Sequence, residues 1–146
     1  MTGTVVGPSA VTFAVLLPAL LVAHQVGDHW AQTDHQAVAK GRRDRSGRMA
    51  CVGHVASYTV VTAGTVAVLW WLLGLPVTPV GFVAGQAISA VTHYWADRRF
   101  TLSWLARVAG KGAFARLGGP LGGGYILDQS WHQLWLLVAA LVTAVA

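Results

Sequence analysis

Histidine and aspartate recur four residues apart in this chain, a pattern that could hold a metal ion. The motif HxxxD occurs twice, and its reverse, DxxxH, occurs once. The three pairs are His24 and Asp28, His93 and Asp97, and Asp128 and His132. Residues four apart in an α-helix lie on one face, about 6 Å apart along the axis, so each pair points in one direction. Imidazoles and carboxylates are ligands that suit zinc, iron or manganese.

Four apolar segments are long enough to be the helices that position these pairs. At about 1.5 Å per residue, each can cross a hydrocarbon core of roughly 30 Å. They cover about residues 5–28, 50–75, 77–97 and 125–146. Only 10% of the 146 residues are charged, whereas soluble domains carry about 25%. The sequence therefore predicts an all-α fold, an integral membrane four-helix bundle of two helical hairpins in a single transmembrane domain.

Lysine and arginine occur in two stretches only, and their distribution predicts the orientation of the helices. All ten fall within residues 40–48 and 98–116. By the positive-inside rule both basic loops face the cytoplasm, which puts both termini outside. The second stretch mixes cations with apolar side chains and forms either an amphipathic segment at the membrane interface or a solvated loop. We expect a multi-pass protein of a bacterial cytoplasmic membrane, with the anionic lipids of the inner leaflet as partners.

This topology brings the histidines and aspartates to one depth. The first and third helices run inward and the fourth runs outward, so reversing HxxxD to DxxxH keeps the histidine deeper. The second helix adds His54, but the position four residues before it, Ala50, carries no carboxylate. We predict one cluster near the cytoplasmic ends, with an opening for water or substrate beside Ala50. The expected metal ligands are His24, Asp28, His54, His93, Asp97, Asp128 and His132.

Seven such groups are enough for one or two divalent ions (zinc, iron or manganese), bridged by carboxylate. A two-metal site can activate water against a phosphoryl or carbonyl group, and the expected catalytic residues are Asp28, Asp97 and Asp128. Neighbouring polar groups would orient the ligands or attract a substrate. The expected orienting residues are Gln32, His35 and Gln129, and the cations expected to attract an anionic headgroup or phosphate are Lys40, Arg43, Arg98 and Arg99.

Four blocks of the sequence stand out together: LLVAHQVGDHWAQTDHQAVAKG, GHVASYTV, HYWADRRF and YILDQSWHQLWL. Over about residues 20–137 they resemble the small bacterial and phage membrane-protein family catalogued as domain of unknown function 3307. The first block matches an HxxGDxxxQ pattern followed by a lysine, at His24, Gly27, Asp28, Gln32 and Lys40, and the last matches DQxxH. The resemblance implies a compact helical membrane domain with shared histidines and aspartates, and it implies no established activity.

Two classes of function remain open. The first is a metal-dependent hydrolase acting on a phosphate-bearing or lipid substrate at the cytoplasmic face. The second is a non-catalytic membrane component, either an ion or proton conduit or a subunit whose metal is structural. The outer halves of the helices offer few polar groups, such as Thr62, Thr65 and Ser89, which favours the hydrolase.

Simpler roles also remain for individual residues. Each aspartate could merely cap a helix or pair with Arg43 or Arg98. Gly81 and Gly85 have the spacing of helix-packing glycines, so a homo-oligomer is possible. No nucleic-acid partner is expected, because the positive-inside rule already accounts for the cations and no recognised nucleic-acid motif accompanies them.

Overall fold

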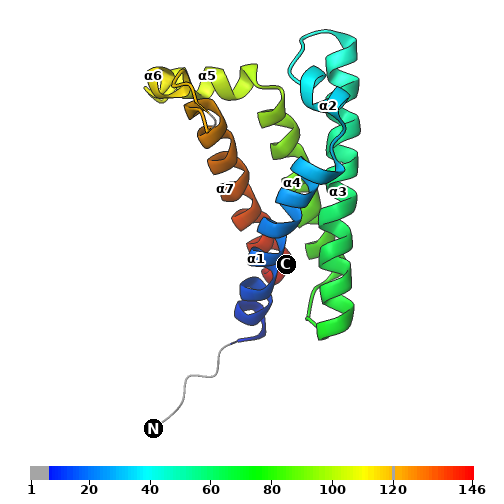
Figure 1. Ribbon diagram of the computed structural model, residues 1–146. Coiled ribbons are helices and arrows are strands. Elements are labelled where there is room, and N and C mark those ends of the chain that lie inside the picture. The colour runs from blue at the N-terminus through cyan, green and yellow to red at the C-terminus, as the bar shows by residue number, and fades with distance from the viewer. Residues whose placement is uncertain (1–6, 120) are drawn as a thin grey trace.

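The computed structural model describes residues 7–119 and 121–146, which form helices without strands (Figure 1). The prediction of an all-α fold is confirmed for this part of the chain. The predicted start of the first helix, at residue 5, lies outside it. The helices are α1 (Pro8–Val26), the π-helical turn η1 (Gly27–Ala31), α2 (Asp34–Ala39), α3 (Arg45–Leu73), α4 (Pro79–Asp97), α5 (Phe100–Val108), α6 (Gly112–Ala115) and α7 (Gly123–Val145).

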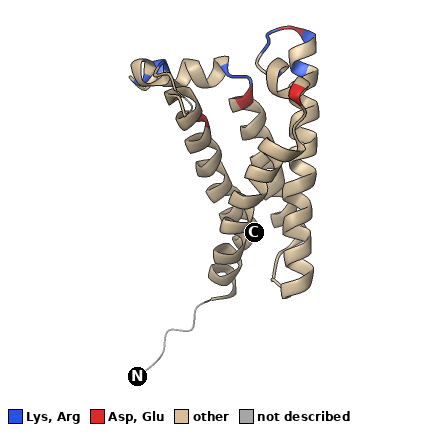
Figure 2. Cartoon of the chain, viewed as in Figure 1, with Lys and Arg blue, Asp and Glu red and all other residues tan. Residues whose placement is uncertain are grey.

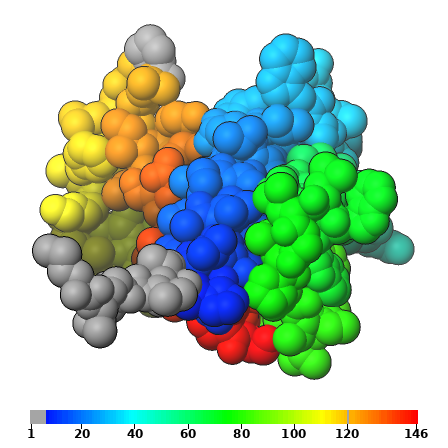
Figure 3. Space-filling view, turned by 90° about the horizontal axis from the view of Figure 1, so that it is seen from below, coloured from blue at the N-terminus to red at the C-terminus, as the bar shows by residue number. Residues whose placement is uncertain are grey.

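The four long helices pack in a ring. α1 lies against α3 and α7, and α4 lies against the same two helices. From below, α1 in blue lies between α7 in orange and red and α3 in green (Figure 3). α4 and α7 approach closely because Gly85 has no side chain: a Cβ there would lie 2.9 Å from the carbonyl oxygen of Ala139. The apolar core comprises Leu16, Leu20, Val66, Leu75, Val77, Leu136 and Ala140.

α3 begins earlier than predicted because Asp44 caps it. The Asp44 carboxylate accepts a hydrogen bond from the backbone N–H of Gly47 at 2.7 Å, which satisfies a donor that the first helical turn leaves unpaired. This bond, together with Arg42 beside the carboxylate, holds the pKa of Asp44 below its usual range. At its other end, α3 stops where Gly74 adopts the left-handed conformation, with φ of 58°.

The first helix does not continue regularly through Asp28. Residues 27–31 form the π-helical turn η1, and the backbone is extended at Gln32 before α2 begins. A π turn holds more residues than an α turn. The α-helical spacing by which Gln32 and His35 were expected to lie on one face with His24 and Asp28 therefore does not hold. The turn packs tightly on α3, because a Cβ at Gly27 would lie 2.8 Å from a ring carbon of Tyr58.

Two segments of the described chain are long and apolar enough to cross a membrane, Pro8–Ala31 and Arg45–Leu73. α4 and α7, which we also predicted to span, are long enough at 19 and 23 residues but are not among these segments, because they are less apolar. Lysine and arginine gather at one end of the molecule, the end at which α2, α5 and α6 lie (Figure 2). α5 runs across this end rather than along the long helices (Figure 1).

Candidate metal centre

The four long helices and η1 contribute side chains to one buried cluster near the basic end. All seven predicted ligands belong to three overlapping groups, and within each group the ligand atoms lie within 4.8 Å of one another. The groups are His24, Asp28 and His93; His54, His93 and Asp97; and Asp97, Asp128 and His132. Side chains distant in sequence thus meet in an arrangement that could hold a metal ion.

Four of these ligand atoms form a compact quartet. The Nε2 atoms of His54 and His93 are 2.9 Å apart. Oδ1 of Asp28 lies 3.3 Å from each nitrogen, and Oδ2 of Asp97 lies 3.1 Å from that of His54 and 3.2 Å from that of His93. Each carboxylate oxygen thus forms a triangle with the two nitrogens, and the centre of such a triangle is about 1.8 Å from each corner. An ion just outside the plane of either triangle could reach its three atoms at the roughly 2.0–2.2 Å of zinc–nitrogen and zinc–oxygen bonds. Each triangle therefore has the size of three ligands of one metal ion.

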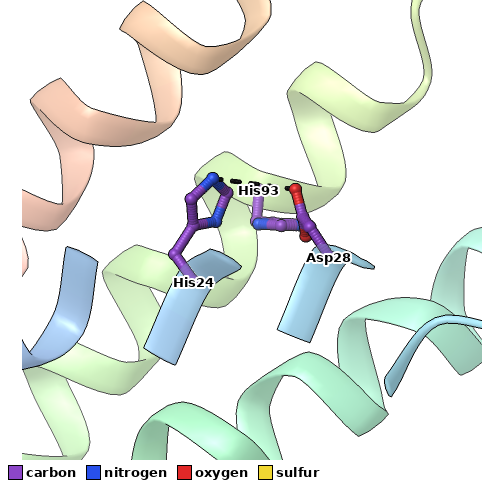
Figure 4. Close-up of side chains that lie close together, drawn as sticks. All are labelled: His24, Asp28 and His93. Atoms are coloured by element: carbon purple, nitrogen blue, oxygen red, sulfur yellow. Dashed lines mark ion pairs between the residues drawn. The ribbon is translucent and has the colours of Figure 1, made fainter. Parts of the chain in front are cut away.

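The hydrogen bonding of the two carboxylates supports this fit. Oδ1 of Asp28 and Oδ2 of Asp97 are buried, and neither accepts a hydrogen bond of ordinary geometry. Leaving a buried charged oxygen without a partner is costly, and a cation at the centre of the quartet would remove that cost. Figure 4 shows His24 and His93 beside Asp28, whose other oxygen, Oδ2, lies 3.6 Å from Nε2 of His24. The residues present fit a divalent ion, and Asp28 can face two positions at once.

A second group, formed by Asp97, Asp128 and His132, offers three ligands rather than four. Nδ1 of His132 lies 2.8 Å from the backbone oxygen of Asp128. This bond fixes the proton on Nδ1, which also lies 3.5 Å from Oδ2 of Asp128, and leaves the lone pair of Nε2 free. This Nε2 is buried without a hydrogen-bond partner. Three protein ligands with a free position are typical of catalytic metal sites, whereas four are typical of structural ones.

A polar cavity of about 410 Å³ opens over the carboxylates. Asp28, Asp97 and Asp128 line it, while the four histidine ligands are at most 3% exposed and lie beneath them. The cavity lies between η1, α5 and α7. The predicted opening beside Ala50 is wrong, because Ala50 is buried and does not line this cavity.

Two of the predicted substrate-attracting cations contact groups of the protein itself, and one of them, Lys40, also lines the polar cavity. Nζ of Lys40 lies 2.8 Å from Oδ1 of Asp97, which leaves Oδ2 to face the histidines. The buried guanidinium of Arg98 donates hydrogen bonds to the backbone oxygens of Lys40 and Arg42. In the described chain, no ion pair joins Asp28, Asp97 or Asp128 to Arg43 or Arg98. Lys40 thus orients a candidate ligand, and Arg98 holds the segment that carries Lys40.

The other two cations lie on the surface. Arg43 is exposed, with its guanidinium carbon 4.7 Å from the centre of the Phe100 ring. Arg99 is also exposed, lines the polar cavity and donates a hydrogen bond to the backbone oxygen of Ala37 at 2.8 Å. Only Arg99 of this pair is placed to meet a molecule inside the cavity.

The three residues expected to orient ligands have different surroundings. Oε1 of Gln129 lies 3.4 Å from Nε2 of His24, and its amide donates to Asp128 at 3.3 Å. Gln32 lines the polar cavity, and its amide nitrogen is buried without a partner. His35 is exposed in the first turn of α2, and no hydrogen bond or ion pair of the described residues joins it to the cluster.

The sequence reasoning missed a polar ladder beneath the cluster. The ring of Tyr58 stacks on His93 with centroids 3.9 Å apart, and its hydroxyl is 2.8 Å from that of Ser89. One turn deeper, Thr62 donates to the side-chain oxygen of Gln86 at 2.9 Å. Tyr58 follows His54 by four residues, so the spacing rule that found the HxxxD pairs would have found it as well.

Comparison with protein families gives one match. The model of a family described as "Protein of unknown function (DUF3307)" matches residues 16–146. The chain belongs to this family. The match confirms the resemblance seen in the four sequence blocks and includes every residue of the candidate metal centre. The family's description names no activity. No curated protein and no solved structure matches the chain.

Proposed function

We propose that this protein is a metal-dependent hydrolase of a bacterial cytoplasmic membrane, acting on a phosphate-bearing or lipid substrate at the cytoplasmic face. In this proposal α1, α3, α4 and α7 form a membrane-spanning four-helix bundle. The basic loops face the cytoplasm and the termini face outward. Exposed apolar side chains on these helices support a lipid environment, since a soluble protein rarely exposes so much apolar surface. They include Val22, Val60, Val68, Val83, Val91, Leu134 and Leu141.

Two metal positions follow from the ligand geometry. Asp28, His54, His93 and Asp97 would hold an inner ion, and zinc, iron or manganese suits their nitrogen and oxygen donors. Asp97, Asp128 and His132 would hold an outer ion beside the cavity. A divalent ion held there would supply a Lewis acid, able to polarise a phosphoryl oxygen and to lower the pKa of water.

The chain's own groups supply the rest of the chemistry. Asp128 has the most exposed side chain of the three aspartates, 25% against 9% for Asp28 and 3% for Asp97. It can therefore accept a proton from water in the cavity. Arg99 places a positive charge at the same cavity, where an anionic substrate would enter. The observation that carries the proposal is that three carboxylates, two with unpartnered inner oxygens, line a polar cavity over buried imidazoles.

A proton conduit is the second candidate, and the polar ladder of Tyr58, Ser89, Thr62 and Gln86 favours it. This ladder continues the polar path about halfway along α4. One turn beyond Thr62, however, Val66 is fully buried in the apolar core with Leu16 and Leu20. A closed apolar layer is a poor route for protons or ions, so the hydrolase is the better-supported function.

Metal analysis of the detergent-purified protein tests the proposal. We expect near-stoichiometric zinc, iron or manganese in the wild type, and loss of metal in folded Asp28→Ala and His132→Ala variants. His35→Ala is the matched control and should keep its metal, because His35 is exposed away from the cluster. The metal-loaded protein should then hydrolyse a member of a panel of phosphomonoesters, phosphodiesters and phospholipids. A metal-free wild type would contradict the metal centre, and a loaded protein inert across the panel would contradict the hydrolase.

A further inference from the structure

An apolar groove adjoins the polar cavity. It has a volume of about 240 Å³ and lies between α5 and α7. Its lining residues include Leu105 of α5, Ala109 at the C-cap of that helix, and Trp131 and Leu134 of α7. Leu102 lines both the groove and the polar cavity. The two spaces are therefore neighbours that share a wall.

The two spaces lie along different faces of α7. Asp128 and Gln129 line the polar cavity, whereas Leu127, Trp131 and Leu134, which follow one another at intervals of four and three residues, line the groove. The indole N–H of Trp131 donates to the backbone oxygen of Thr92 at 3.2 Å, so its polar atom is satisfied and its ring can serve as an apolar wall. A molecule that occupied both spaces would need a polar end and an apolar tail.

Positive charge accompanies both spaces. Arg99 lines the polar cavity and Lys111 lines the groove. Arg99 is held at φ of 56°, a value rare for residues other than glycine. Its side chain packs so closely on Gly41 that a Cβ there would lie 2.7 Å from Cδ of Arg99. Strain of this kind concentrates at functional sites, and here it accompanies a guanidinium at the cavity.

The position of α5 suits an amphiphile delivered by the bilayer. α5 lies across the basic end of the long helices (Figure 1), and Trp104 and Val108 are exposed on it. A helix with this composition and orientation belongs at the level of the lipid headgroups. The exposed Ala109 and Leu134 place part of the groove wall at the molecular surface.

We propose that the substrate is a lipid whose phosphate-bearing headgroup enters the polar cavity and whose hydrocarbon chain lies in the groove between α5 and α7. This inference rests on the hydrolase function proposed above and names its substrate class. The wall that the two spaces share at Leu102, their opposite polarity and the cations beside them select an anionic lipid over an apolar helix of a partner protein. A soluble phosphate ester would fill only the polar cavity.

Binding tests the groove without relying on catalysis. Dodecyl phosphate with bromine atoms on its chain quenches tryptophan on contact, so we expect it to quench the wild type more than Trp131→Phe. Brominated dodecanol, which has no phosphate, should bind more weakly.

Ala109→Phe fills the groove and should weaken binding of the brominated dodecyl phosphate roughly tenfold, as expected if about two methylene groups lose their burial. Ala87→Phe, at an exposed alanine of α4, is the matched control and should bind as the wild type does. Ser130 also lines the groove, and Ser130→Phe provides a second groove variant if Ala109→Phe does not fold.

Hydrolysis then separates the two proposals. The metal-loaded wild type should cleave dodecyl phosphate in preference to ethyl phosphate, and Ala109→Phe should lose this preference while still cleaving ethyl phosphate. Equal cleavage of both esters, with no effect of Ala109→Phe, would overturn the groove and leave the hydrolase standing. Quenching of Trp131 without cleavage of any ester would overturn the hydrolase and retain a lipid-binding groove. If Ala109→Phe instead converts a dimer to a monomer without changing lipid binding, the groove belongs to a second copy of the chain and the inference is wrong.

Discussion

Replacing Asp97 by asparagine should abolish most of the stabilisation that a metal ion gives this protein. Asparagine keeps the shape of the side chain but removes the charge that faces His54 and His93 at 3.1 and 3.2 Å. Four-ligand zinc sites contribute about 10–16 kcal/mol of apparent binding free energy, or roughly 2.5–4 kcal/mol per ligand. At about 1.4 kcal/mol per factor of ten, loss of one ligand raises Kd about 10²- to 10³-fold.

The expected change in stability follows from this shift in Kd. At a free zinc concentration of about 100 times the wild-type Kd, binding stabilises the folded wild type by about 2.7 kcal/mol. At the same concentration the Asp97→Asn variant has a ratio of metal to Kd of only about 0.1–1, so it gains at most about 0.4 kcal/mol. For a chain of this size the wild type should gain about 5–10 °C in Tm, and the variant about 1 °C.

Thermal unfolding of the detergent-solubilised protein, followed by tryptophan fluorescence in chelator and then in graded zinc, measures this difference. His35→Gln is the control and should respond as the wild type does, because His35 is exposed away from the cluster. If Asp97→Asn keeps the full metal-induced shift, the quartet does not bind the ion. A wild type whose Tm is the same in chelator and in every metal tried would refute the reasoning altogether.

Three further outcomes follow from single contacts. Lys40→Met should weaken metal binding about 10- to 100-fold, less than Asp97→Asn does, because Lys40 only orients the Asp97 carboxylate. Competition with a chelating dye measures the Kd for the metal, and an unchanged Kd would contradict this role of Lys40. Gly85→Val should disrupt the packing of α4 on α7, whereas Gly64→Val should be tolerated, because a Cβ at Gly64 meets no atom within 4 Å. Size-exclusion profiles compare the two variants, and equal behaviour would contradict the close approach of α4 and α7 at Gly85. The lowered pKa of Asp44 means that its charge stabilises the fold at neutral pH and that this contribution disappears as the pH falls through the folded-state pKa. Tm should therefore fall more between pH 7 and pH 3 in the wild type than in Asp44→Asn, whose side chain can still cap α3. Parallel curves of Tm against pH for the two proteins would contradict this expectation.

The sequence by itself determined which residues meet at the candidate site. A spacing of four places a histidine and an aspartate on one helical face, because backbone hydrogen bonds within the helix fix that geometry locally. Hydrophobic segments long enough for helices then gave the all-α class, and the reversed order in Asp128 and His132 indicated a common depth. The three overlapping ligand groups contain all seven residues chosen in this way.

Tertiary structure alone decided how the site is built and where it opens. The π turn at Asp28 ended the helical spacing on which the interpretation of His35 depended, and it forms where Gly27 packs against Tyr58 of α3. Whether Lys40 meets a carboxylate or solvent is likewise set by packing between helices, since Lys40 is distant in sequence from Asp97 and α2 and α4 both pack on α3. The cavity and the groove beside it exist only where α5 meets α7. Local periodicity fixes the direction of a side chain along its own helix, whereas ligand distances, ion-pair partners and openings depend on contacts between helices, which periodicity does not encode.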